Sequence, residues 1–143
     1  MTQAVLVNID VDDLALAEAF YTRAFGLRAT RRFGFDGVEL AGAAVPLYLL
    51  RKPAGSLACD VPAPARGAVR DYARHWTPVH LDFVVDDLDA ALARAESAGA
   101  RREGEVRTAG WGRIATLVDP FGHGLCVLQF LGRGYDEITT PAA

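Results

Sequence analysis

The chain carries one sequence pattern twice, and this repeat constrains its fold more than any other feature. Val11-Asp12-Asp13-Leu14, followed by alanines at positions 17 and 19, recurs as Val85-Asp86-Asp87-Leu88 with alanines at 91 and 93. The copies begin at positions 11 and 85, so they lie 74 residues apart in a chain of 143. Self-similarity at a fixed offset is typical of a repeated structural unit, so the sequence predicts two similar modules in tandem.

Each copy has the pattern of a strand followed by a helix. Residues 5–11 and 79–85 alternate between apolar and polar, which is typical of a half-buried strand. A helical pattern follows and ends at Gly26 in the first copy and at Gly99 in the second. An aspartate at each helix start can accept hydrogen bonds from the free N–H groups of the first turn. The candidates for this cap are Asp12 or Asp13, and Asp86 or Asp87.

Three strand-like runs follow each helix, separated by turns that contain glycine. We expect these strands at residues 27–33, 37–40, 46–51, 100–107, 112–118 and 125–131. The predicted fold class is therefore α+β, with two tandem βαβββ modules in a single domain of residues 1–143. The expected parts are module one at about 4–52, a connection at about 53–76, module two at about 77–131 and a C-terminal tail at 132–143.

The connection between the modules breaks the repeat. It contains three prolines and two glycines, and residues 65–74 favour a short helix. The segment is longer than most connections in compact domains, which indicates either a functional flap or a mobile linker.

Composition excludes several classes of partner. The net charge is −3 and charged residues of both signs are interleaved, so no basic face is available for nucleic acid or an anionic membrane. No apolar run approaches the roughly 20 residues that span a bilayer, and the Met-Thr-Gln-Ala start lacks the pattern of a secretion signal. We expect a cytoplasmic protein in which Cys59 and Cys126 are free thiols.

Three segments together resemble the pattern of a known superfamily. They are the Val11–Leu14 run, the helix from Ala17-Glu18-Ala19-Phe20-Tyr21 to Phe25-Gly26-Leu27, and Asp119-Pro120-Phe121-Gly122 before the last apolar strand. The combination resembles the vicinal oxygen chelate superfamily of glyoxalases, bleomycin-resistance proteins and extradiol dioxygenases. The resemblance covers about residues 5–130. It implies a pseudo-two-fold axis between the modules, mixed sheets that curl around a central cup, and a homodimer, with modules paired within one chain or exchanged between chains.

The resemblance also implies where a metal would bind. In metal-using members, the first and last strands of each module each supply one ligand. The corresponding positions here are Leu6, Tyr48, His80 and Cys126. A divalent ion needs three or four converging donors, and only His80 keeps the expected residue type. We therefore expect no cofactor, with His80 and Cys126 as the ligands if a divalent metal binds.

The same geometry predicts a small-molecule site. Residues two apart on a strand share a face, so Asn8 and Asp82 join the ligand positions, although a slip of one residue would turn Leu49 inward instead of Tyr48. An apolar bowl with a few polar groups is typical of such sites. Asp82, Asn8 or Glu39 could also complete a metal site. The predicted ligand-binding residues are Asn8, Tyr48, Trp76, His80, Asp82, Arg113, Cys126 and Phe130.

Several of these residues have two interpretations. His80 is the predicted catalytic residue because imidazole titrates near neutrality, but it could instead be a half-buried histidine satisfied by Asp82. Trp76 is either a wall of the site or a packing residue. Arg113 either holds an anionic group of a ligand or forms an exposed ion pair. His123 is most simply a solvent-facing turn residue.

Three roles remain, of which a purely structural one is the least favoured. We favour capture of a small organic molecule, a metabolite or antibiotic, in a metal-free cup of the bleomycin-resistance type. The alternative is a lyase, isomerase or dioxygenase, similar to lactoylglutathione lyase, in which His80 acts with Cys126 or an acidic neighbour, with or without a divalent metal. We do not expect nucleophilic hydrolysis, because Ser56 and Ser97 are the only serines, both lie outside the predicted site, and no Gly-x-Ser-x-Gly motif is present.

Overall fold

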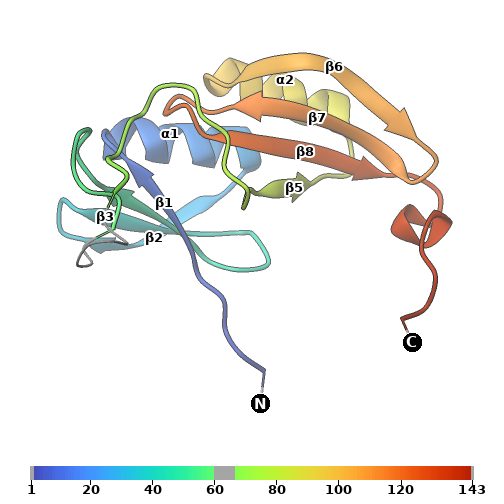
Figure 1. Ribbon diagram of the computed structural model, residues 1–143, viewed down its shortest axis with the longest axis horizontal. Helices are drawn as coiled ribbons and strands as arrows, with labels where there is room; N and C mark the ends of the chain where they lie inside the picture. Colours follow the sequence, from blue (N-terminus) through green and yellow to red (C-terminus); the bar gives the residue numbers. More distant parts are fainter. Residues whose placement is uncertain (1, 60–66, 143) are drawn as a thin grey trace. The chain divides into compact units, whose positions relative to one another are not determined.

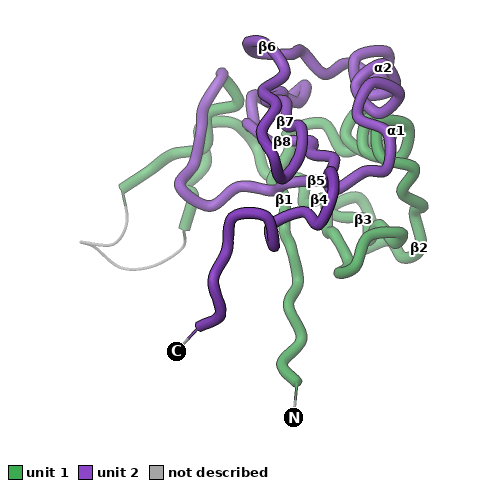
Figure 2. The backbone as a smooth tube through the Cα atoms, turned by 90° about the vertical axis from the view of Figure 1, so that its right-hand side faces the viewer, with its two compact units in different colours: residues 1–73 green, residues 74–143 purple. Residues whose placement is uncertain are grey.

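The chain folds into two compact units, Met1–Ala73 and Arg74–Ala143, shown in different colours in Figure 2. The computed structural model describes residues 2–59 and 67–142. Along the chain, the order strand, helix, strand, strand, strand occurs twice, and each unit contains one four-stranded sheet and one α-helix (Figure 1). The predicted α+β fold of two βαβββ modules is confirmed.

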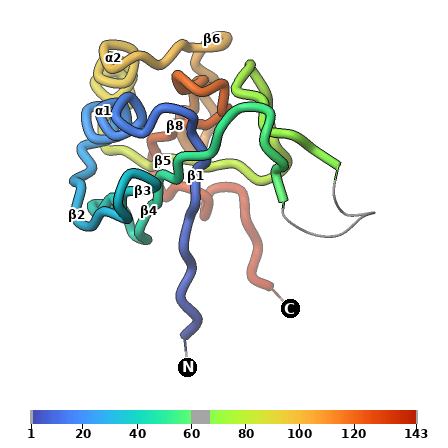
Figure 3. The backbone as a smooth tube through the Cα atoms, turned by 90° about the vertical axis from the view of Figure 1, so that its left-hand side faces the viewer, coloured from blue at the N-terminus to red at the C-terminus, as the bar shows by residue number. Residues whose placement is uncertain are grey.

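The first unit has a mixed sheet with strand order β1-β4-β3-β2. Strands β1 and β4 run parallel, and the other neighbours are antiparallel. The chain can be followed through this unit from blue to green in Figure 3. Its elements are β1 (Val7–Val11), α1 (Leu14–Phe25), β2 (Arg28–Phe33), β3 (Gly37–Ala41) and β4 (Leu47–Arg51).

The second unit repeats this topology with strand order β5-β8-β7-β6, in which β5 and β8 are parallel. The strand predicted at residues 79–85 is shorter than expected, because only residues 82–84 face pairing partners in β8. The elements are β5 (Asp82–Val84), α2 (Leu88–Ala98), β6 (Arg101–Ala109), β7 (Gly112–Val118), β8 (Gly124–Phe130) and a 3₁₀ turn η1 (Gly134–Glu137).

Both helices are capped at their N-terminus by the second aspartate of the repeated pair. The Asp13 carboxylate accepts from the Leu16 backbone N–H at 2.9 Å, and the Asp87 carboxylate accepts from that of Ala90 at 3.0 Å. These bonds satisfy donors that have no partner within the first helical turn. Helix α1 ends at Gly26, whose φ of 66° lies in the left-handed region that favours glycine.

Each sheet has one face covered by its own helix and one face without a helix, which we call the helix-free face. The covered faces form the two cores. In the first unit the core joins helix to sheet through Ala17, Phe20, Tyr21, Ala24, Val38, Leu40, Leu47 and Leu49. In the second it does so through Leu88, Ala91, Leu92, Ala95, Ala115, Leu117, Leu125 and Val127. Among the described residues, no helix is long and apolar enough to cross a membrane.

The described part of the connection up to Ala73 belongs to the first unit. Leu57 and Val69 form an antiparallel bridge, and the Arg70 backbone N–H donates to the Ser56 carbonyl at 2.7 Å. The helix predicted at 65–74 is therefore wrong over the described residues 67–74, which form no helical turn: Val69 bridges to Leu57, and Ala73 and Arg74 form a bend. Residues 65 and 66 lie outside the described residues.

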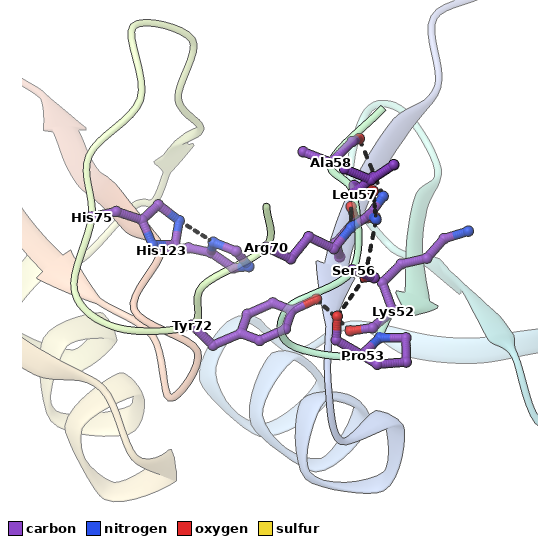
Figure 4. A network of polar contacts seen from close by, with 10 residues as sticks. Lys52, Pro53, Ser56, Leu57, Ala58, Arg70, Tyr72, His75 and His123 are labelled. Carbon is purple, nitrogen blue, oxygen red and sulfur yellow. Dashed lines mark hydrogen bonds and ion pairs between the residues drawn. The ribbon is translucent and has the colours of Figure 1, made fainter. Parts of the chain in front are cut away.

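Two side chains fasten this segment to the first sheet. Arg70 Nε donates to Asp10 Oδ2 at 2.8 Å, which joins the connection to β1. The Tyr72 hydroxyl donates to the Lys52 carbonyl at 2.7 Å, just after β4 (Figure 4). The part of the connection that contains these residues is therefore built into module one.

Candidate functional site

The helix-free face of the second sheet presents one row of side chains across its four strands. Asp82 of β5 lies opposite Cys126 of β8, Cys126 lies opposite Thr116 of β7, and Thr116 lies opposite Glu103 of β6. Directly opposed residues share a face of a sheet. His80 lies two residues before Asp82, just ahead of β5, and its hydrogen bond to Asp82 places it beside this row.

His80 and Asp82 form a hydrogen-bonded pair, with 2.9 Å between His80 Nδ1 and Asp82 Oδ1. A carboxylate can only accept, so Nδ1 carries the proton and Nε2 of the neutral ring is left as the acceptor. About a third of each side chain is exposed, 34% for His80 and 32% for Asp82. The pair therefore presents a fixed imidazole that a ligand can reach.

Cys126 lies next to this pair but is buried, with 4% of the residue exposed. Burial, followed by the negative charge of Asp82, raises the pKa of the Cys126 thiol above its ordinary value of 9.0. Donor atoms of His80, Asp82 and Cys126 all lie within 4.8 Å of one another. The three residues thus form one cluster, in which the thiol stays protonated at neutral pH.

Trp76 stands beside the cluster as an aromatic wall. Its ring lies 5.0 Å from the His80 ring, centroid to centroid, with a tilt of 34° between the planes. The indole rests on Gly124 at the start of β8, where a Cβ atom would lie only 1.7 Å from Trp76 Cε3. Trp76 nevertheless remains 45% exposed. It can therefore contact a ligand while holding the His80 ring in place.

Arg74 supports Trp76 from the edge of the sheet. Its guanidinium lies 5.6 Å from the centre of the Trp76 ring, a cation–π distance. The same guanidinium forms a two-point ion pair with Glu103, including Arg74 Nε to Glu103 Oε1 at 2.6 Å. This pairing lowers the pKa of the Glu103 carboxyl. Neither Arg74 nor Glu103 was predicted as part of the site.

His123 is not the solvent-facing turn residue that the sequence suggested. It is half-buried, and its Nδ1 lies 2.7 Å from Nε2 of His75 (Figure 4). The His75 backbone N–H also donates to the Gly122 carbonyl at 2.9 Å. The prediction was wrong because the chain before β5 packs against the Asp119–His123 turn. This contact is long-range, so no local sequence pattern predicts it.

The helix-free face of the first sheet carries an equivalent row. Asn8 of β1 lies opposite Tyr48 of β4, and Tyr48 lies opposite Glu39 of β3. The predicted orientation of Tyr48 holds, because Leu49 is fully buried on the opposite, helix-covered face. The Tyr48 hydroxyl donates to Glu39 Oε2 at 2.6 Å, and this bond raises the Tyr48 pKa.

A β-bulge in β2 concentrates polar groups around Glu39. The pairing shifts so that Thr30 and Arg31 both lie opposite Glu39. Thr30 Oγ1 donates to the carboxylate at 2.7 Å, and Arg31 donates to both of its oxygens. The hydrogen bonds from Arg31, Tyr48 and Thr30, in decreasing order of effect, lower the Glu39 pKa to about 2.

The four positions implied by the resemblance do not fit a divalent metal. Leu6 has no donor atom. The Tyr48 phenol already donates to Glu39, and its raised pKa disfavours the phenolate that a metal would bind. Only two donors of that set remain, His80 and Cys126. A catalytic metal site needs at least three protein ligands.

The last two predicted site residues lie in different places. Phe130 is on the helix-free face of β8, 39% exposed, with its ring 4.8 Å from that of Tyr135. Arg113 points to the helix-covered face of β7 and pairs with Asp89 of α2 at 3.0 and 3.1 Å. The structure therefore does not bring Arg113 to the cluster, and its interpretation as an ion pair is the one observed.

Comparisons with known proteins agree with this architecture. The sequence profile of the family described as "Glyoxalase-like domain" matches residues 6–128. An uncharacterized protein of Mycobacterium bovis is 34% identical over 123 residues, which cover 84% of this chain and 78% of the relative. An uncharacterized protein of Mycobacterium tuberculosis has the same identity, with 70% of its length covered.

Solved structures share the fold. A fosfomycin resistance protein from Listeria monocytogenes has a TM-score of 0.67 at 16% identity, covering 92% of this chain and 95% of that protein. A lactoylglutathione lyase from Agrobacterium tumefaciens has a TM-score of 0.61 at 26% identity, covering 90% and 94%. From its match over residues 6–128 and its two βαβββ modules, the chain belongs to the glyoxalase-like domain family of the vicinal oxygen chelate superfamily.

Proposed function

We propose that this protein binds a small organic molecule on the helix-free face of its second sheet, without the inherited four-ligand metal site. The observation that carries the proposal is the exposed Trp76 ring stacked beside the His80–Asp82 pair. Val84 and Phe130 on the same face are 59% and 39% exposed. An apolar surface with a few fixed polar groups is the usual composition of a small-molecule site.

Each residue has a distinct role in this proposal. Trp76 stacks against a planar or apolar part of the ligand, and His80 Nε2 forms a hydrogen bond with a polar group. Asp82 fixes the imidazole, and Phe130 extends the apolar contact. Cys126 lies on the same face of the second sheet, whereas Asn8 and Tyr48 lie on the helix-free face of the first sheet.

A thermal-shift screen tests this function. The panel contains fosfomycin, bleomycin and lactoylglutathione, which represent chemistries named for related proteins, together with a metabolite library, all in the presence of EDTA. A ligand at about one hundred times its Kd adds about 2.7 kcal/mol of stability, which raises Tm by several degrees in a domain of this size. The ligand should be recovered chemically unchanged.

Variants locate the binding surface. His80→Ala should weaken binding of a compound found in the screen, because it removes the polar contact beside Trp76. Arg113→Ala is the matched control, since Arg113 lies on the helix-covered face and should leave affinity unchanged. Equal loss in both variants, or a panel without any stabilising compound, would contradict the proposal.

The His80–Asp82 hydrogen bond favours acid–base catalysis as a second candidate function. A carboxylate that holds Nδ1–H leaves Nε2 as a base, which suits proton transfer in a lyase or isomerase. Lactoylglutathione is the first substrate to test. Turnover that His80→Gln abolishes while ligand binding persists would support an enzyme. Recovery of unchanged lactoylglutathione after prolonged incubation with the protein would leave binding as the function.

We also propose that the protein is a homodimer, as the family resemblance implies, and that it acts in the cytoplasm. Light scattering coupled to size-exclusion chromatography should give a mass close to twice 15.3 kDa. A mass close to 15.3 kDa at all concentrations would contradict the dimer.

Fractionation of the producing cells tests the proposed cytoplasmic location.

A further inference from the structure

We propose that Arg107 determines ligand specificity on the helix-free face of the second sheet, and that the ligand is a flat organic anion with a hydroxyl or N–H group at its opposite end. The inference rests on the proposed small-molecule function and names the class of molecule bound. Arg107 holds the oxyanion, Trp76 stacks against the ring, and His80 Nε2 accepts from the hydroxyl or N–H group.

The strand register places Arg107 on this face. Arg107 of β6 lies opposite Ile114 of β7, and Ile114 lies opposite Leu128 of β8. Leu128 lies opposite Val84 of β5, which is 59% exposed. Directly opposed residues share a face of a sheet. The Arg107 side chain therefore lies in the row next to the one that contains Cys126.

An irregularity in β6 moves Arg107 towards the cluster. From Glu103 to Arg107 the strand advances four residues, whereas its partner β7 advances only from Thr116 to Ile114. In a regular ladder Arg107 would lie opposite Gly112, so the shift brings it two residues nearer to Thr116, about 7 Å along the sheet. Bulges of this kind redirect side chains and are common beside binding sites.

Arg107 is also a cation without an acidic partner. Residues 74–142 contain seven arginines and no lysine. Five of the seven pair with carboxylates, namely Arg74, Arg101, Arg102, Arg113 and Arg133. Of the other two, Arg94 lies on α2, and Arg107 forms no ion pair within the described part of the chain. A guanidinium in this state can bind an oxyanion through two parallel hydrogen bonds.

The positive charge of Arg107 acts on the cluster. Burial and the negative charge of Asp82 raise the pKa of the Cys126 thiol, and the charge of Arg107 opposes them. The Arg107 guanidinium is thus close enough to Cys126 to share a ligand with the cluster. The acidic residue Glu103 on the same face does not compete for it, because Arg74 Nε donates to Glu103 Oε1 at 2.6 Å.

The first sheet shows the effect of an acidic partner. Arg31 donates to Glu39 Oε2 at 2.6 Å, so its charge is satisfied inside the protein. Glu39 lies opposite Tyr48 of β4. The equivalent position in the second sheet, opposite Cys126 of β8, is occupied by Thr116. Because threonine carries no charge, the second sheet leaves its arginine available to a ligand.

The spacing of the groups sets the size of the ligand. Trp76 rests on Gly124, and Leu128 in the Arg107 row lies four residues further along β8, about 13 Å at the usual rise of a strand. The Arg107 side chain covers part of this distance. A molecule of two fused rings with polar groups at opposite ends matches the remainder.

Two probes that differ in charge test the inference. The full chain, labelled with ¹⁵N, is titrated with 6-hydroxy-2-naphthoate and with its neutral analogue 6-hydroxy-2-naphthamide. The naphthoate should shift the indole N–H signal of Trp76 and the Nε–H signal of Arg107. It should bind about tenfold more tightly than the amide, the usual advantage of a hydrogen bond between charged groups.

Matched variants identify the anchor. Arg107→Gln should bind the naphthoate no better than the amide, with Tm unchanged because no ion pair is lost. Arg107→Lys keeps the charge without the planar fork and should retain part of the preference. Arg102→Gln is the control, because it removes the same charge from β6 on the helix-covered face, where Arg102 donates to Glu96 at 2.9 Å. It should keep the full preference.

Three results would overturn the inference. Equal affinity of the two probes at Trp76 would show that charge is not recognised, and would leave the small-molecule function standing. Equal loss of preference in Arg102→Gln and Arg107→Gln would assign the effect to net charge. Absence of naphthoate binding at Trp76 and Arg107 at millimolar concentration would exclude this class of ligand. The proposed function fails separately, when no compound in the thermal-shift panel stabilises the protein.

Discussion

At the scale of single residues, the helix-free face of the second sheet depends on close packing between Trp76 and Gly124. The indole occupies the space in which any other residue at position 124 would place its Cβ atom. Glycine is required there by that contact. Trp76 in turn packs against His80, so one backbone position controls the geometry of the proposed binding surface.

Gly124→Ala should therefore displace Trp76. We expect a loss of about 1–3 kcal/mol in unfolding free energy, the usual cost of overpacking, together with weaker binding of any compound found in the screen. Gly110→Ala is the control, because a Cβ at Gly110 meets no atom within 4 Å. Chemical denaturation measures both variants, and equal stability of the two would refute the close contact.

The carboxylate of Glu39 predicts a pH effect. Its pKa of about 2 in the folded protein lies below the ordinary 4.5, mainly because of the Arg31 hydrogen bond. Between these values the unfolded state binds more protons, so the stabilisation is present above about pH 4.5 and is lost as pH falls through about 2.

The measurement is Tm from pH 7 to pH 2 for wild type and Glu39→Gln. The stability advantage of the wild type should shrink as the pH falls through this range. Glu105→Gln, at an exposed glutamate of β6, should follow the wild type throughout. A constant difference between wild type and Glu39→Gln at every pH would argue against the predicted protonation.

At the scale of secondary-structure elements, capping determines where each helix begins. Sequence periodicity predicted both helices but left the cap open between adjacent aspartates, since Asp12 and Asp13 are the same residue type. The structure resolves this choice, because Asp13 and Asp87 accept the backbone hydrogen bonds.

Asp13→Ala should destabilise the protein by about 0.5–2 kcal/mol, the usual loss for an N-cap aspartate. Asp12→Ala is the matched control at the neighbouring position and should change stability by less than about 0.5 kcal/mol. Urea denaturation of the two variants measures the difference. The reverse order of stabilities would show that the cap lies at Asp12.

At the scale of the whole molecule, repeated local patterns predicted the two modules, whereas long-range register determined the site. The offset between the repeats placed Asn8 and Asp82 at equivalent positions in β1 and β5, whereas the inward orientation of Tyr48 was implied by the family resemblance. Glu103 of β6 lies opposite Thr116 of β7, beside the cluster in the second unit, and no local sequence pattern predicts this position.

The helix predicted in the connection between the modules was wrong for a related reason. Its composition allowed a short helix over residues 65–74, but Val69 and Arg70 pair with Leu57 and Ser56 in the first unit. Such contacts across a loop outweigh weak helical propensity, which is a small energy per residue. The elements were therefore predictable, while their irregular contacts required the structure.

Amide chemical-shift mapping tests the central claim most directly, namely that ligand binding belongs to the helix-free face of the second sheet. ¹⁵N-labelled full-length protein is titrated with the compound that gives the largest thermal shift. We predict the largest changes at Trp76, His80, residues 82–84 and residues 126–130. Changes concentrated instead in α2 and around Arg113, on the helix-covered face, would contradict the account.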